Sequence, residues 1–179
     1  MSCAGKNELK ISRIRVLLPL TFCFWFCCES RCQDKTLSYV KRYVKVPAGY
    51  LMVLRQNDSV LGQLANFAQA EKIPSANFTG MGFVDITFGF FDFETKKYKP
   101  RDFKHVELVS MHGTIAWKKD STSIHAHGVV ADNAFQTFGG HILNATVGTG
   151  SVEILITVHD KPFERTKDDA IGADVLSLD

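Results

Sequence analysis

Residues 124–142 have the sequence IHAHGVVADNAFQTFGGHI and hold three of the six histidines of this 179-residue chain. His125 and His127 are two positions apart, and the pair Gly139-Gly140 directly precedes His141. Side chains alternate between the two faces of a strand, so His125 and His127 are expected on one face, about 6.5–7 Å apart along it. A third imidazole returning after a turn would complete a three-histidine set, which for zinc leaves a fourth position open to water or substrate.

The chain around this stretch is expected to be a run of strands. Residues His105–Trp117 and Thr122–Ala131 are predicted to pair as a hairpin joined by Lys118-Lys119-Asp120-Ser121. Asp132-Asn133 and Gly139-Gly140 are predicted to form the turn that brings His141 back toward the pair. The histidine stretch would then lie at the centre of a β-rich second half.

The first part of the fold is expected to contain two strands and a helix. Tyr39–Val46 and Tyr50–Arg55 are rich in Val, Tyr and Leu and are separated by a Pro-Ala-Gly turn signal. Asn57 or Asp58 is expected to cap a helix in which apolar residues recur every three or four positions, ending before Pro74. This is the one segment with a clear helical pattern.

The remaining segments are predicted to be strands and loops. Ala76–Phe93 is expected as two strands joined near Gly82–Asp85, followed by a polar loop over Glu94–Arg101. Val152–His159 is expected as the last long strand, and Val175–Leu178 as a short strand or docking segment. The fold class is therefore α+β, mainly antiparallel sheet with one principal helix, in a single domain.

Gly80 and Gly82 interrupt the Phe-rich segment. They lack the third glycine of a dinucleotide fingerprint and do not open a helix, so phosphate binding is not expected. Close backbone approach or a positive φ angle explains them better. The phenylalanines from Phe78 to Phe93 are expected in the core or a subunit interface rather than in base stacking.

Residues 1–32 are predicted to be a secretory signal peptide. Lys10, Arg13 and Arg15 precede the apolar run VLLPLTFCFWFCC over Val16–Cys28, as in the n-region and h-region of such signals. The run is shorter than the about 20 apolar residues of a transmembrane helix. Small residues at Ser30 and Cys32 favour cleavage after Cys32 and export of the rest. Lipidation of Cys28 or Cys32 is one alternative, and a cytoplasmic protein with a non-functional signal is another.

The composition beyond residue 32 excludes some chemistry. All five cysteines lie at or before this position, so the predicted mature domain has no disulfide, thiolate metal site or nucleophilic cysteine. Residues 33–179 hold 16 basic and 17 acidic residues, a net charge of −1. A domain with this net charge has little overall electrostatic attraction to the phosphate backbone of a nucleic acid.

Four motifs in order resemble the plants and prokaryotes conserved (PPC) domain over roughly residues 37–178. They are Phe78-Thr79-Gly80-Met81-Gly82 after the helix, Glu107-Leu108-Val109-Ser110 ahead of Gly113, His125-Ala126-His127 and Gly139-Gly140-His141. The resemblance implies an α+β fold around an antiparallel sheet, related to that of acetolactate decarboxylase, and assembly as a homotrimer. In prokaryotic members the matching histidines bind zinc, which would carry over to His125, His127 and His141.

The chain also departs from the family pattern. Plant members join this domain to an AT-hook with an Arg-Gly-Arg core, and this tripeptide does not occur here. Their Gly-Arg-Phe-Glu-Ile-Leu signature is replaced by Lys104-His105-Val106-Glu107-Leu108-Val109. Many bacterial members nevertheless carry a DNA-binding label. Nucleic acid is therefore not expected as a partner, although that label belongs to the family.

Three other side chains are polar enough to be considered for a role at the site, namely Glu107, His105 and His112. Glu107 is a candidate to orient a ligand histidine, to complete the coordination, or to act as a base toward a metal-bound water. A structural carboxylate is the alternative for Glu107. His105 and His112 have no spacing that predicts ligation and are expected to be structural.

Three functions follow from these expectations. The favoured one is a non-catalytic trimeric domain that binds a metal or small ligand outside the cytoplasm. The second is a zinc-dependent enzyme acting on a small carbonyl or carboxylate substrate, because three histidines with an open position suit such chemistry. The third is DNA binding.

Overall fold

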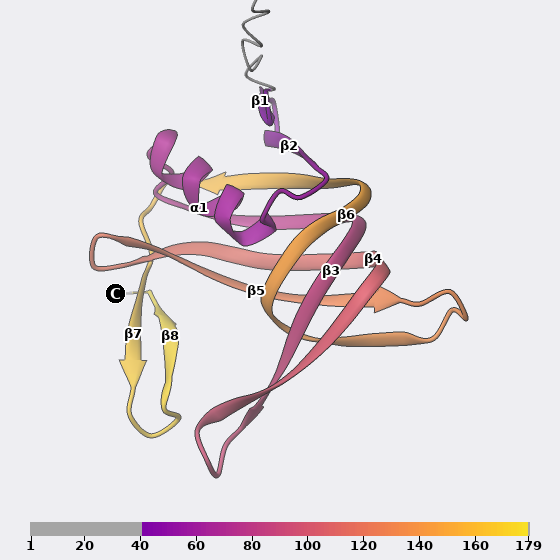
Figure 1. Ribbon diagram of the computed structural model, residues 1–179. Helices are drawn as coiled ribbons and strands as arrows, with labels where there is room; N and C mark the ends of the chain where they lie inside the picture. Colours follow the sequence, from indigo (N-terminus) through magenta and orange to yellow (C-terminus); the bar gives the residue numbers. More distant parts are fainter. Residues whose placement is uncertain (1–40, 179) are drawn as a thin grey trace, which may run out of the picture. The chain divides into compact units, whose positions relative to one another are not determined.

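The computed structural model describes residues 41–178, so the predicted signal peptide lies outside the described residues. The elements in chain order are β1 (Tyr43–Val46), β2 (Gly49–Arg55), α1 (Val60–Ala70), β3 (Ser75–Asp92), β4 (Lys97–Lys118), β5 (Ser121–Ala131), β6 (Thr137–His159), β7 (Glu164–Asp168) and β8 (Ala173–Ser177). Figure 1 shows one helix against a β-rich body. No helix among the described residues is long and apolar enough to cross a membrane.

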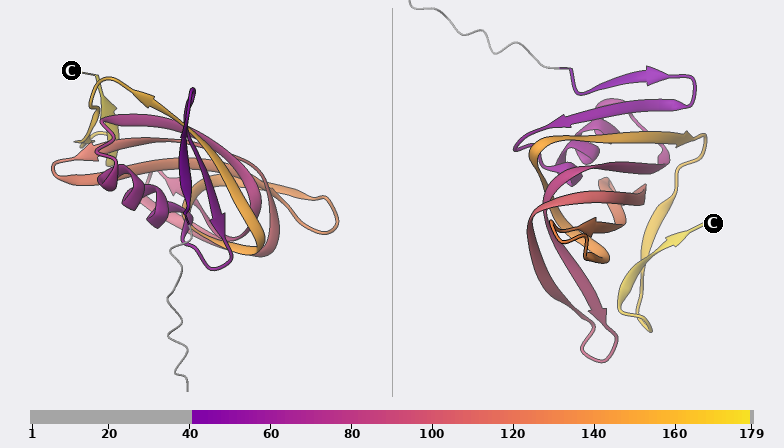
Figure 2. Two further views of the ribbon diagram at one scale, coloured as in Figure 1. Left: turned by 90° about the horizontal axis from the view of Figure 1, so that it is seen from above. Right: turned by 90° about the vertical axis from the view of Figure 1, so that its right-hand side faces the viewer.

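Four long strands form the centre of the sheet. β3 pairs with β4 and β6, and β5 pairs with β4 and β6, so these four strands close a circuit with antiparallel pairing throughout. β3, β4 and β6 have 18, 22 and 23 residues, and Figure 2 shows them curving as they cross the domain. β2 and β1 extend the sheet from β6, and β7 and β8 extend it from the end of β4. The predicted fold class is confirmed.

The core lies between the curved sheet and the helix. On β6, Val152, Ile154 and Ile156 are buried while the residues between them are exposed, as strand alternation requires. Helix α1 buries an apolar stripe that includes Leu64 and Phe67 and packs on β5 and β6. The apolar side chains of the helix and of the inner face of the sheet thus form one hydrophobic core, whose burial stabilises the fold.

The helix is confirmed, but the predicted cap is wrong. Ser59 is the N-cap, and its Oγ accepts a hydrogen bond from the backbone N–H of Gly62 at 3.2 Å. Asn57 has a φ of 70° and lies in the preceding turn. The Asp58 carboxylate is engaged in that turn, where it accepts from the backbone N–H of Arg55 at 2.7 Å. Because the Asp58 carboxylate is hydrogen-bonded within the turn, the hydroxyl of the next residue, Ser59, caps the helix.

The predicted break near Gly82–Asp85 is also wrong, because β3 runs without interruption. The glycines lie instead at irregularities of pairing, with register shifts between Gly80 and Gly82 and between Val84 and Ile86. Gly82 has a φ of 151°, and a Cβ at this position would lie 2.1 Å from the carbonyl oxygen of Ser151. The expected close backbone approach is thus confirmed. The predicted polar loop is shorter than expected, since β4 begins at Lys97.

The turn that returns His141 is made by residues 132–136 and not by Gly139-Gly140. The Asp132 carboxylate accepts hydrogen bonds from the backbone N–H groups of Ala134 and Gln136, both at 2.9 Å. Gly139 and Gly140 lie within β6, opposite Val129 and Gly128 of β5. A Cβ on Gly139 would lie 2.8 Å from the carbonyl oxygen of Gly128, so these glycines permit close strands. Strand β7 was not predicted, whereas the short strand near Val175 is present as β8.

Candidate metal centre

Two adjacent strands position the three histidines. His125 and His127 lie on β5, and His141 lies on β6 directly opposite His127. Ala126, between the first two, is buried, so alternation turns both imidazoles to the outer face of the sheet. The prediction that the pair shares one face is confirmed.

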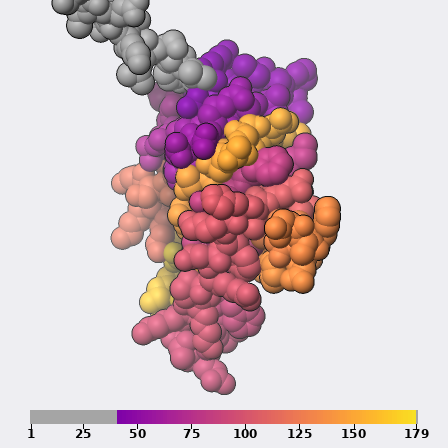
Figure 3. All heavy atoms as spheres, turned by 45° about the vertical axis from the view of Figure 1, so that its right-hand side comes forward, coloured from indigo at the N-terminus to yellow at the C-terminus, as the bar shows by residue number. Residues whose placement is uncertain are grey.

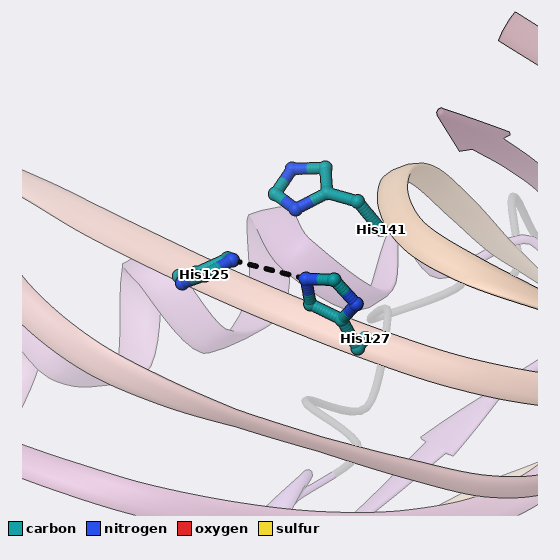
Figure 4. A group of neighbouring side chains, drawn as sticks. All are labelled: His125, His127 and His141. Carbon is teal, nitrogen blue, oxygen red and sulfur yellow. Dashed lines mark hydrogen bonds between the residues drawn. The ribbon is translucent and has the colours of Figure 1, made fainter. Parts of the chain in front are cut away.

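The three rings converge on one point (Figure 4). The Nε2 atoms of His125 and His127 are 3.2 Å apart, and one ligand nitrogen from each of the three histidines lies within 4.8 Å of the others. Tetrahedral zinc with Zn–N bonds of about 2.0–2.1 Å requires nitrogens roughly 3.3 Å apart. The pair has this spacing, and His141 faces it from β6. The donor set therefore fits a small divalent cation.

The protonation of the cluster favours metal binding. Burial, and then the neighbouring His125, His127 and Arg165, lower the pKa of His141 to about 4. The pKa of His125 is lowered by burial and then by Arg165, and that of His127 by burial and then by His112. All three imidazoles are consequently neutral at neutral pH, which is the form that ligates a metal. The buried Nδ1 of His141 has no hydrogen-bond partner among the described residues.

Two further rings border the cluster. The Tyr98 ring stacks on His141 with centroids 4.7 Å apart and planes at 20°. His112 pairs with His127 across β4 and β5, with ring centroids 6.5 Å apart. The sequence contained a signal for His112, because a two-residue hairpin loop at Lys119-Asp120 places position 112 opposite position 127.

The other candidates from the sequence lie elsewhere. Glu107 is opposite Ala131 of β5 and Phe83 of β3, and it lines a separate hollow of about 290 Å³. Among the described residues, the group of candidate metal ligands consists of the three histidines alone. The side chain of His105 is 86% exposed. Its backbone N–H donates to Asp85 Oδ1 at 2.8 Å, where the pairing of β3 and β4 is irregular. The structure does not bring Glu107 or His105 to the cluster.

A cavity of about 530 Å³ opens beside the histidines. His125 and His141 form part of its wall, together with the end of the β3–β4 hairpin, the β4–β5 hairpin and the β7–β8 hairpin. Arg165 of β7 lines it and is only 7% exposed. No local pattern in the sequence points to Arg165, since β7 consists of polar residues without apolar alternation.

The family model of the Plants and Prokaryotes Conserved domain, abbreviated PCC or PPC, matches residues 41–160. The chain belongs to the PPC domain family. The resemblance seen in the sequence is confirmed.

Solved structures of similar fold span most of this PPC chain. A candidate DNA-binding protein from Ralstonia eutropha JMP134 is 51% identical, with a TM-score of 0.75, covering 77% of this chain and 96% of its own. A plant- and prokaryote-conserved protein from Pyrococcus horikoshii is 28% identical, with a TM-score of 0.66, covering 73% and 92%. A metal-containing protein from Archaeoglobus fulgidus is 22% identical, with a TM-score of 0.65, covering 76% and 98%. Among curated proteins, none matches this chain.

Proposed function

We propose that this PPC domain is a zinc-binding protein that holds one ion per chain through His125, His127 and His141. The observation that carries the proposal is the convergence of three neutral imidazoles, with ligand nitrogens within 4.8 Å of one another. Imidazole is a preferred ligand of zinc, and the mature chain offers no thiolate to compete for it. Bound through three histidines, zinc would supply a Lewis acid with an open position for a ligand.

The neighbouring residues support the geometry of such a site. The Tyr98 ring packs flat on His141 and limits its rotation, and His112 packs beside His127. The Archaeoglobus fulgidus protein is described as metal-containing, but at 22% identity the likeness concerns the fold. The proposal therefore rests on the cluster in this chain.

The metal content of the purified protein tests the site directly. We expect about one zinc per chain in the wild type and loss of at least about 100-fold in zinc affinity in His127→Ala, since removing even an indirect partner of a ligand costs 10–100-fold. Elemental analysis after dialysis measures both. His105→Asn is the matched control, because His105 lies outside the cluster at a φ of 53° that asparagine tolerates. Full zinc occupancy in His127→Ala would refute the three-histidine site.

We do not extend the proposal to catalysis. A zinc-dependent hydrolytic or carbonyl chemistry needs a base within hydrogen-bond reach of the reacting group. Glu107, the candidate from the sequence, lines the hollow formed with Met81 and Phe83 and not the cavity beside the histidines. Ligand binding is the activity that the site supports best.

Assembly as a homotrimer is part of the proposal, and the outer face of the sheet supports it. Large apolar side chains are exposed on the adjacent strands β2, β6, β3, β4 and β5, namely Leu51, Leu155, Met81, Phe83, Val109 and Val129. In Figure 3, β6 crosses this side of the surface between β2 and the β3–β4 hairpin. An apolar surface on neighbouring strands is typical of a subunit interface.

Light scattering of the purified protein is expected to give three times the mass of one chain. Met81→Asp should shift it toward the monomer, since a charge would be buried in the interface while the fold is unaffected at a residue 59% exposed. Val175→Asp on β8 is the control, because this residue is also exposed but lies away from the apolar face. A monomeric wild type would contradict the proposal.

Export of the domain also remains a proposal. Its support is the basic and apolar pattern of residues 10–28, which lie outside the described residues. Zinc and a small ligand would then be bound outside the cytoplasm.

The support for DNA binding is the description of similar proteins, among them the Ralstonia eutropha relative. The charge of the chain argues against it. Residues 33–179 have a net charge of −1, whereas phosphate contacts by Lys and Arg provide most non-specific affinity for DNA. We therefore place it below metal and ligand binding.

A further inference from the structure

The cavity beside the histidine cluster has an unusual charge distribution. Four cationic side chains and one acidic side chain line it, namely Lys96, Lys118, Arg165, Lys167 and Asp174. Phe91, Tyr98 and Ile124 add apolar walls. The cavity thus offers an excess of positive charge together with surface for an organic group.

The lysines of the cavity already have partners. Lys118 pairs with Asp174, with Nζ and Oδ2 2.7 Å apart. Lys167 lies 3.6 Å from a carboxylate oxygen of Asp169, and Lys96 donates to the backbone carbonyl of Asp169 at 2.9 Å. Lys118 and Lys167 therefore have carboxylate partners, and Lys96 is held at the surface by a backbone carbonyl.

Arg165 is different, because it is buried without a counter-ion. Its only hydrogen bond among the described residues runs from Nη2 to the hydroxyl of Thr114, and its buried Nε has no partner. Burial lowers the pKa of the guanidinium, and Asp174 offsets this only in part. A buried cation without a paired carboxylate is costly unless a ligand supplies the missing charge.

The chemistry of the site selects the ligand. A guanidinium presents its donors in a planar fork that matches the two oxygens of a carboxylate. Arg165 is the one buried charged side chain among the described residues, so the site suits a planar group of one negative charge better than a phosphate of nearly two. The apolar walls suit the carbon skeleton of an organic acid. Arg165 also lies close enough to His125 and His141 for its charge to act on both.

We propose that Arg165 binds the carboxylate group of a small organic acid in this cavity, so that the remainder of the acid lies beside the three histidines. This proposal names a ligand for the proposed zinc site. It rests on the zinc proposal only in one respect, the contact that the other end of the acid makes with the metal. The β7–β8 hairpin, which supplies Arg165 and lies next to the end of β3 and β4 in Figures 1 and 2, is then a wall of the ligand site.

Titration calorimetry of the full chain with succinate, its neutral diamide succinamide and inorganic phosphate tests the proposal. Succinate is expected to bind, and both succinamide and phosphate to bind at least about tenfold more weakly. Arg165→Gln should lower the succinate affinity at least about tenfold, because hydrogen bonds to a charged group are lost. Lys104→Gln, at an exposed lysine that pairs with Asp85 and does not line the cavity, should change it less than about threefold.

Thr114→Val separates ligand binding from a merely structural role. It removes the hydroxyl that accepts from Arg165 but keeps the guanidinium, so succinate affinity should remain near that of the wild type. If Arg165 only tethers β7 to β4, Arg165→Gln and Thr114→Val would lower stability alike and leave succinate binding unchanged, which would overturn the proposal. Phosphate binding tighter than succinate would overturn it as well.

Zinc content measured in the same samples distinguishes the two proposals. A wild type that lacks zinc but binds succinate through Arg165 would refute the metal site and support the carboxylate site. A wild type with one zinc per chain that binds neither succinate nor phosphate would refute the carboxylate site alone.

Discussion

Zinc is expected to raise the thermal unfolding midpoint of the metal-free protein by roughly 10 °C. A ligand that binds only the folded state at 100 times its dissociation constant adds about 2.7 kcal/mol to the free energy of unfolding. For a domain of about 140 residues, each kcal/mol corresponds to roughly 3–5 °C. The unfolded chain does not bind in the same way, because His141 meets His125 and His127 only when β5 and β6 are paired.

Circular dichroism of chelator-treated protein, with and without added zinc, measures this shift. In His141→Ala the shift should fall below about 3 °C, because two imidazoles on β5 retain only weak affinity. Magnesium should have no effect on the wild type, since it prefers oxygen ligands. A zinc-induced shift of the same size in His141→Ala would show that the metal binds elsewhere.

The site could be predicted in part from the sequence because strand alternation is a local property. His125 and His127 needed only the period of two, and the resemblance to the family supplied His141. His112 was within reach of the same reasoning, since the short loop at Lys119-Asp120 fixes which residues of β4 and β5 are opposite each other. The information that points to His112 is thus the register of β4 against β5, which places it opposite His127.

Arg165 could not be found in this way. It follows His141 by 24 positions, and it reaches the cavity because β7 pairs in parallel with the end of β4 at Trp117 and Glu164. The segment Glu164–Asp168 is polar throughout, so neither periodicity nor propensity predicts a strand. Its position depends on long-range pairing, which a local pattern does not contain.

The glycines of β3 show how a correct physical interpretation can accompany a wrong boundary. The close backbone approach expected at Gly82 is present, whereas the strand break predicted at the same residue is not. In a sheet of long curved strands, a glycine at a positive φ angle permits a bulge without ending the strand. Gly82 pairs with Leu108 of β4 and Val152 of β6, so a side chain there has no open space.

Gly82→Ala is therefore expected to lower the free energy of unfolding by about 3 kcal/mol or more. A non-glycine residue at a disfavoured positive φ costs about 1–3 kcal/mol, and overpacking against neighbours costs about 1–3 kcal/mol more. The added Cβ would lie 2.1 Å from the carbonyl oxygen of Ser151 and 2.7 Å from the Cα of Val152. Both contacts are with backbone, which cannot move aside without separating β3 from β6. Urea denaturation with the midpoint and slope compared between variants measures the loss.

Gly148→Ala is the matched control on the facing strand. A Cβ there would meet its nearest neighbours, the backbone of Phe83 and Val84, at an ordinary 3.7 Å. Its effect should stay within about 1 kcal/mol, because removing a glycine restricts the unfolded chain without straining the folded one. Equal stability of the two variants would contradict the steric role of Gly82. Gly82 is opposite Val152, which lies far along β6 from His141. Folded Gly82→Ala protein should therefore still be stabilised by zinc. This result would show that Gly82 is needed for the fold and not for the metal site.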